Sequence, residues 1–141
     1  MSRPDDLRSL TLFADCSDAE LAHAASLLTT IDASPGRVLM MQGHSACQFV
    51  IVADGHIEVV HHHDGSPDLR VTLGPDSHVG EVGLLDHIPC TATVRTEAGA
   101  KLHVAGTREF RELAGILSVA CNLRSVADDR MAENELVDSL F

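Results

Sequence analysis

The sequence predicts an α+β fold, in which a β-sandwich or barrel is preceded by one helix and followed by others. Apolar residues recur at helical spacing near both ends of the chain, and between these regions short apolar runs are separated by turns that contain glycine. The chain has 141 residues, of which 45% are hydrophobic, so it can bury a substantial core. We therefore expect a single domain over residues 1–141.

The first expected helix covers residues 18–28, after a short lead that carries apolar anchors at Leu10 and Phe13. Ser17 and Glu20 have the spacing of a capping box, in which each side chain accepts a hydrogen bond from the other residue's backbone. The apolar face of this helix is formed by Leu21, Ala24, Ala25 and Leu28.

Residues 29–106 carry the strand pattern. The strands that we expect are 37–42, 49–53, 57–61, 69–73, 91–96 and 102–105. Ser34-Pro35-Gly36 and Gly74-Pro75 are turn signals, and Asp54-Gly55 is typical of a tight hairpin. Short strands at such regular spacing favour an antiparallel sandwich or barrel.

The C-terminal part, about residues 107–135, predicts helices. Thr107 is a suitable N-cap, an apolar stripe follows, and Gly115 is a point where the helix can break. The stripe covers roughly two heptads, fewer than a coiled coil needs, so we expect packing against the protein's own sheet. About ten residues follow the stripe, too few for a helix-turn-helix, and we expect no DNA-binding domain.

Charge and composition exclude several classes of function. The formal net charge is −11, with no local cluster of Lys and Arg, which disfavours nucleic acids and anionic lipid surfaces. No apolar run reaches about 18 residues and the N-terminus has no signal-peptide pattern, so we expect a cytoplasmic protein without membrane insertion. Four widely spaced cysteines are then expected to be free thiols.

The most informative stretch is 80–94. It begins with Gly80 and Glu81, continues with a short apolar turn of helix, is interrupted at Pro89, and ends in an alternating strand. A turn of helix between two strands leaves unpaired backbone N–H groups at its start, and such groups bind anions.

The order of helix, strands and helices, with Gly80-Glu81 and Leu84-Leu85 between the expected strands 69–73 and 91–96, resembles the cyclic-nucleotide-binding domain. This is the sensor domain of the catabolite activator protein, of cAMP-dependent kinase regulatory subunits and of gated ion channels. The resemblance covers roughly residues 10–127 and includes spaced glycines and the run from Phe49 to Gly55. It implies an eight-stranded antiparallel, jelly-roll-like β-roll, flanked by an N-terminal helix and two C-terminal helices.

Residues 80–94 resemble the family's phosphate-binding cassette. The resemblance implies that Glu81 accepts a hydrogen bond from the ribose 2′-hydroxyl, and that the N–H groups of Gly83 and Leu84 face the cyclic phosphate. Thr91 and Ala92 would donate to the phosphate or to the base edge. The ligand-binding residues that it implies are Gly80, Glu81, Val82, Gly83, Leu84, Cys90, Thr91 and Ala92. Instead of binding the ribose, Glu81 could be a carboxylate at a helix N-terminus that interacts favourably with the helix dipole.

Cys90 departs from the family pattern, which has an arginine bonded to the phosphate at this position. A thiol is a weak donor without a fixed charge. Loss of a hydrogen bond to a charged group, about 1.5–3 kcal/mol, weakens binding by about one to two orders of magnitude. Arg95 lies too far along the strand to replace it. Cys90 itself is either a neutral filler of the pocket or a reactive thiol beside helix N–H groups.

Other candidate chemistry is weaker. His56 and His61-His62-His63 invite a metal site, but adjacent strand residues point to opposite faces, so we expect solvated imidazoles at a hairpin end. The cysteines lack the close spacing of an iron–sulfur site, and we find no enzyme motif.

The sequence therefore predicts a stand-alone regulatory or sensor domain that is not an enzyme, holds no metal, and binds cAMP or cGMP weakly because of Cys90. The alternative is a protein-interaction module that uses the same fold without a nucleotide. In the family the C-terminal helix also pairs two subunits. The partners that we expect for this chain are therefore a second copy of itself, in a homodimer, or a protein that it regulates.

Overall fold

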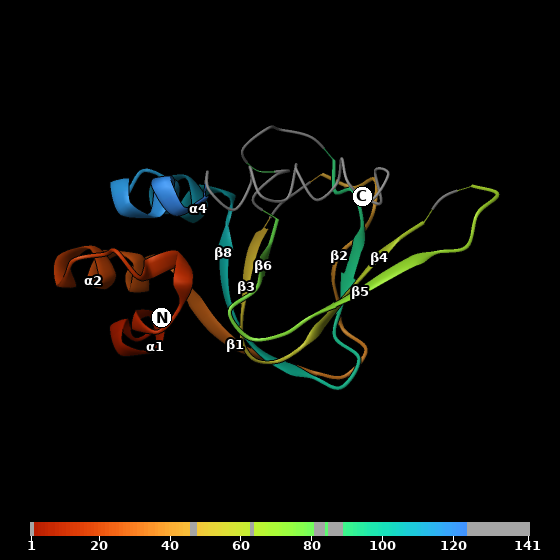
Figure 1. The fold of residues 1–141 in the computed structure, drawn as a ribbon, viewed down its shortest axis with the longest axis horizontal. Helices are drawn as coiled ribbons and strands as arrows, with labels where there is room; N and C mark the ends of the chain where they lie inside the picture. The colour runs from red at the N-terminus through yellow and green to blue at the C-terminus, as the bar shows by residue number, and fades with distance from the viewer. Residues whose placement is uncertain (1, 46–47, 63, 81–83, 85–88, 124–141) are drawn as a thin grey trace.

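The computed structural model describes residues 2–45, 48–62, 64–80, 84 and 89–123. Its strands form two four-stranded antiparallel sheets, with strand orders β1-β8-β3-β6 and β2-β7-β4-β5. The helices lie together on one side of the first sheet, and the second sheet lies on its other side (Figure 1). This arrangement confirms the predicted β-roll with helices before and after it.

Three short helical elements precede the strands: α1 (Pro4–Arg8), the 3-10 turn η1 (Thr11–Phe13) and α2 (Asp18–Leu27). The predicted capping box at the start of α2 is confirmed, because Glu20 N donates to Ser17 Oγ at 3.2 Å and Ser17 N donates to Glu20 Oε1 at 2.9 Å. The segments α1 and η1 lie in the stretch that we expected to be only an anchored lead. Their apolar residues Leu7, Leu10, Leu12 and Phe13 are buried.

The eight strands confirm the number that the family resemblance implies, and the strand pattern had located six of them. They are β1 (Thr29–Ala33), β2 (Val38–Met40), β3 (Gln48–Gly55), β4 (Ile57–His61), β5 (Leu69–Leu73), β6 (His78–Val79), β7 (Thr93–Arg95) and β8 (Ala100–Gly106). The strand pattern did not predict β1 or β6 as separate elements. Gly55, at the predicted hairpin, has a φ of +80°, which glycine adopts without strain.

Apolar side chains form two cores, one on each face of the first sheet. The helix-side core joins the helices to Phe49 and Ile51 of β3, and the rings of Phe49 and Phe110 have centroids 4.9 Å apart. The inter-sheet core lies between the two sheets and includes Val50 and Val52 of the same strand. Thus alternate residues of β3 serve opposite cores, as the two-residue period of a strand requires.

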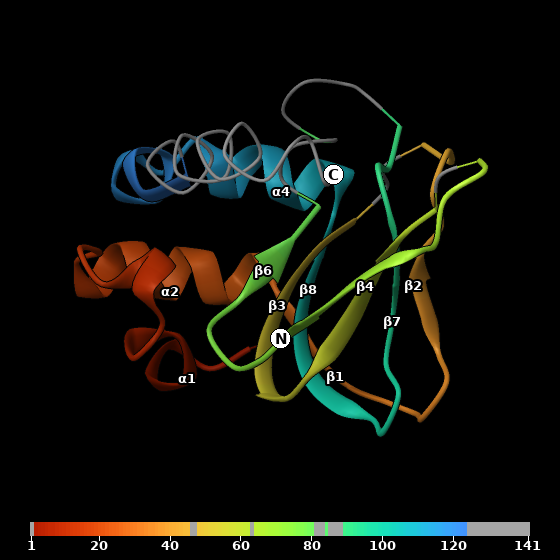
Figure 2. The same ribbon diagram turned by 45° about the vertical axis from the view of Figure 1, so that its right-hand side comes forward.

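After β8 the chain forms α4 (Thr107–Ala114), which lies beside α2 and against the sheet (Figure 2). The predicted N-cap was wrong by one residue: Gly106 has the extended cap conformation and Thr107 is already helical. The predicted break is confirmed at Gly115, and the chain is helical again over 117–123. The remainder of the predicted C-terminal helix lies outside the described residues. No helix of the described part has both the length and the apolar character that a membrane crossing requires.

The capping box gives a test of the fold. Ser17→Ala removes the side-chain acceptor for the Glu20 N–H, and we expect the free energy of unfolding to fall by about 1 kcal/mol. Glu20→Gln keeps an acceptor for the Ser17 N–H and should change stability less at neutral pH. Urea denaturation of both variants measures the difference. Equal losses, or no loss in Ser17→Ala, would show that tertiary packing alone determines where α2 begins.

Candidate functional site

The candidate site is the connection between the two sheets. It leaves β6, at the edge of the first sheet, and enters β7, which lies between β2 and β4 in the second sheet. The strand β6 has two residues, and it is held to β3 by the pairs Val50↔Val79 and Ile51↔His78. Residues 80–92 therefore start at the edge of one sheet and end inside the other.

Gly80 ends β6 in a conformation that a side chain would not allow. Its φ is +100°, and a Cβ atom built there would lie 2.4 Å from the carbonyl oxygen of Gln48 and 3.0 Å from Cε of Met40. Leu84 N donates to the carbonyl oxygen of Gly80 at 3.1 Å. Leu84 packs against the helix-side core.

Three of the predicted ligand-binding residues, Glu81, Val82 and Gly83, lie outside the described residues. Their implied contacts with ribose and phosphate remain predictions, as do those of Leu84, Thr91 and Ala92.

The second half of the site is held on its β2 side by backbone contacts. Gly43 N donates to Cys90 O at 2.8 Å, and Cys90 N donates to His44 O at 2.8 Å. Cys90 is half-buried and packs against the inter-sheet core. Ala92 and Val94 belong to this core.

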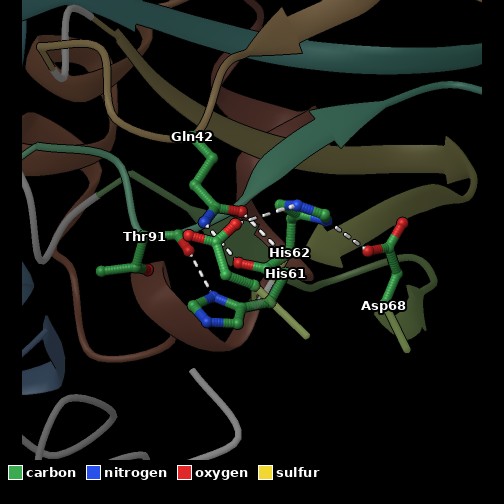
Figure 3. A network of polar contacts seen from close by, with 6 residues as sticks. Gln42, His61, His62, Asp68 and Thr91 are labelled. Carbon is green, nitrogen blue, oxygen red and sulfur yellow. Dashed lines mark hydrogen bonds and ion pairs between the residues drawn. The ribbon is translucent and has the colours of Figure 1, made fainter. Parts of the chain in front are cut away.

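On the β4 side the same segment is held by side chains (Figure 3). His61 Nδ1 lies 2.5 Å from the carbonyl oxygen of Thr91. A carbonyl oxygen only accepts, so Nδ1 carries the proton and donates it. Gln42 bonds the His62 backbone twice, through Nε2 to O at 2.9 Å and through Oε1 from N at 2.8 Å, while Gln42 N donates to Thr93 Oγ1 at 3.1 Å.

Arg95 is engaged away from position 90. Its Nη2 lies 3.0 Å from Oε1 of Glu58, a buried carboxylate that also pairs with Arg70. A hydrogen bond from Glu97, followed by those from the two arginines, lowers the pKa of Glu58, and the same contact with Glu58 raises the pKa of Glu97. The side chain of Arg95 thus has its own anionic partner on the second sheet.

The described histidines of the run 61–63 bond to different partners. His61 turns to Thr91 and His62 to Asp68, with Nδ1 2.6 Å from Oδ1 (Figure 3), while His63 lies outside the described residues. The hydrogen bond to Asp68 raises the pKa of His62. In the part of the chain that the structure describes, no three His, Cys, Asp or Glu side chains lie close enough together to hold a metal ion. Cys16 and Cys121 are free thiols there.

The sequence did not identify Gln42, Gln48 or His61 as parts of this site. We expected solvated imidazoles at a hairpin end; the His61 contact is exposed, and the bond to Thr91 is a partner that this expectation did not include. The three residues act through partners that are far away in the chain or through their own backbone, so no local pattern marks them. The one local signal for such residues is a polar residue that stands beside apolar residues near the end of a strand.

These features define a two-sheet β-roll that is covered by helices on one side and carries a glycine-dependent turn between its sheets. A family model described as "Cyclic nucleotide-binding domain" matches residues 30–115. The chain belongs to the cyclic-nucleotide-binding domain family.

Relatives of known name agree with this assignment. The acetyltransferase Pat of Mycolicibacterium smegmatis is 35% identical over 92 residues, which are 65% of this chain and 28% of Pat. The catabolite activator protein of Thermus thermophilus superimposes with a TM-score of 0.81 at 25% identity, covering 92% of this chain and 62% of that one. The cAMP-binding acyltransferase of Mycobacterium smegmatis has a TM-score of 0.74 at 28% identity, with coverages of 93% and 41%. The chain thus spans less than two thirds of each of these proteins.

The geometry at Gly80 can be tested by comparing two glycines. Gly80→Ala forces a Cβ against the Gln48 carbonyl at a positive φ, whereas Gly43→Ala meets a similar φ, +85°, with no atom within 4 Å. We expect Gly43→Ala to cost about 1 kcal/mol of unfolding free energy and Gly80→Ala about 2–4 kcal/mol. Thermal or urea unfolding gives both values. Equal costs would mean that the close approach to Gln48 does not constrain the turn.

Proposed function

We propose that this chain is a regulatory domain that binds a cyclic nucleotide, cAMP or cGMP, in the segment 80–92. The observation that carries the proposal is Gly80, whose missing side chain lets the chain pass the Gln48 carbonyl where the segment that resembles the phosphate-binding cassette begins. In this proposal the ribose is held by Glu81 and the phosphate by the N–H group of Gly83, because the N–H of Leu84 already donates to the Gly80 carbonyl. Thr91 and Ala92 complete the site from the second sheet.

The arrangement of the second half supports binding without the family arginine. Hydrogen bonds from both neighbouring strands hold Cys90 and Thr91 in place. A ligand therefore meets a segment whose shape does not depend on the side chain at position 90. The missing charge lowers the affinity, and the shape of the site is retained.

A regulatory output requires that the ligand favour one state over another. Leu84 packs against the helix-side core, and Cys90 and Ala92 pack against the inter-sheet core. The proposed ligand would contact both halves of this connection and so bias the position of α4 and the helix that follows. No step of chemistry is part of this proposal, and the chain acts by binding.

Calorimetric titration tests the proposal. We expect cAMP or cGMP to bind the wild-type chain weakly, Cys90→Arg to bind about ten- to a hundredfold more tightly, and Glu81→Ala to lose binding. Thermal stability of each variant without ligand is the control for folding. If neither the wild type nor Cys90→Arg binds either nucleotide up to millimolar concentration, the segment is not a nucleotide site.

A second function is supported by one observation: position 90 lacks the arginine that the family uses for the phosphate. Leu117, on the helix after α4, is 76% exposed, but a single exposed leucine is normal on a protein surface and does not by itself mark an interface. In this alternative the domain is a protein-interaction module, with a second copy of the chain or a regulated protein as partner. Binding that appears only in Cys90→Arg would favour it.

A further inference from the structure

The turn between β5 and β6 contains a residue with a strained backbone, Asp76. Its φ is +75°, and it is the one residue other than glycine with a positive φ in the part of the chain that the structure describes. A side chain makes this left-handed conformation unfavourable, so the conformation persists only where surrounding contacts hold it. The contacts of Asp76 therefore indicate why the conformation is kept.

The Asp76 carboxylate bonds to Thr11, the first residue of η1, which lies 65 positions away in the chain. Thr11 N donates to Oδ1 at 2.8 Å, and Thr11 Oγ1 donates to Oδ2 at 2.5 Å. An N–H group at the start of a helical turn has no partner within that turn, and a charged acceptor makes the stronger bond. Both carboxylate oxygens of Asp76 thus bond to the N-terminal helical region.

The backbone of the same turn is part of the first sheet. Asp76 N donates to Val52 O at 2.9 Å, and Val52 N donates to Ser77 O at 2.8 Å. The pairing with β3 then continues through the two residues of β6, as far as Val79. The backbone position of Asp76 is therefore fixed by β3, and its side chain reaches from the sheet to η1.

On its other side, η1 is bonded to the C-terminal helix over 117–123. Asn122 Nδ2 donates to Leu12 O at 3.0 Å, and Ser118 Oγ, one turn earlier, donates to Glu20 Oε1 at 3.1 Å. The apolar face of this helix packs in the helix-side core. Apolar packing is non-directional, so we expect the polar bonds to determine where the helix lies along its axis.

We propose that Asp76, Thr11 and Asn122 form a latch, which fastens the C-terminal helix over 117–123 to the turn that enters β6. The turn and the helix are coupled because η1 is hydrogen-bonded to both of them. The latch itself needs no ligand. Its use in regulation rests on the proposed function, since the turn that it holds leads into Gly80, where the candidate site begins.

Amide hydrogen exchange of the full chain, measured without nucleotide, tests the latch. Asp76→Gly removes the carboxylate and places at this φ the residue type that adopts it without strain. Thr11→Val removes the Oγ1 donor and keeps the backbone N–H. We expect exchange over 117–123 to become about three- to tenfold faster in Asp76→Gly, because local opening of the helix then breaks fewer bonds. The increase in Thr11→Val should be smaller.

Asp54→Gly is the matched control for the loss of a carboxylate from a turn. Asp54 Oδ1 accepts from the adjacent Gly55 N at 3.0 Å, so this bond stays within its own hairpin. Exchange over 117–123 should be the same in Asp54→Gly as in the wild type.

The pattern of exchange distinguishes a latch from a general loss of stability. Strands β3 and β8 should keep wild-type exchange in Asp76→Gly. Asn122→Ala should accelerate exchange over 117–123, and adding Asp76→Gly to it should cause no further increase, because both substitutions open the same link. Unchanged exchange over 117–123 in Asp76→Gly overturns the inference, as does acceleration across all strands or independent effects of the two substitutions. Titration of the wild type with cAMP and cGMP tests the proposed function separately, so either proposal can fail alone.

Discussion

The close approach of Gly80 to Gln48 is the constraint on which the candidate site depends. The strand β6 contributes two ladder pairs to the sheet, so little else fixes where the chain leaves it. Gly80 must pass the Gln48 carbonyl at a distance that excludes a Cβ atom, and it does so at a positive φ. The direction of the turn after β6, and with it the start of the 80–92 connection, follows from this contact.

The far end of the connection is fixed differently, by polar contacts from both sides. Backbone groups of Gly43 and His44 hold Cys90, and the side chain of His61 holds Thr91. Gln42 joins these two supports, because its amide bonds the His62 backbone as a strand neighbour would. The geometry of the segment and the charge at position 90 are therefore separate properties, and a substitution can change one without the other.

The sequence predicted the structural features that depend on a local residue pattern. It did not predict the features that depend on partners far away in the chain. The capping box of α2 and the break at Gly115 involve residues within one or two turns, and both are present. Strand β1 pairs with β8, about seventy residues away, and although Thr29, Thr30 and Ile31 are β-branched, the strand is too polar for an apolar alternation to mark it. The bond from His61 to Thr91 joins residues 30 positions apart. Gly80 was identified by a motif, whereas the reason for glycine there is the Gln48 carbonyl, which only the fold reveals.

The 80–92 connection is also where the two cores meet. Leu84 packs on the helix-side core, and Ala92 packs on the inter-sheet core. Packed cores resist continuous deformation, so a ligand that changes the spacing of the two halves must move one core relative to the other. The helix-side core is the one that contains Phe110 and Leu113 of α4. A small displacement of Leu84 would therefore be transmitted to the C-terminal helices through direct packing, and the energy available for that movement is the difference in ligand affinity between the two positions.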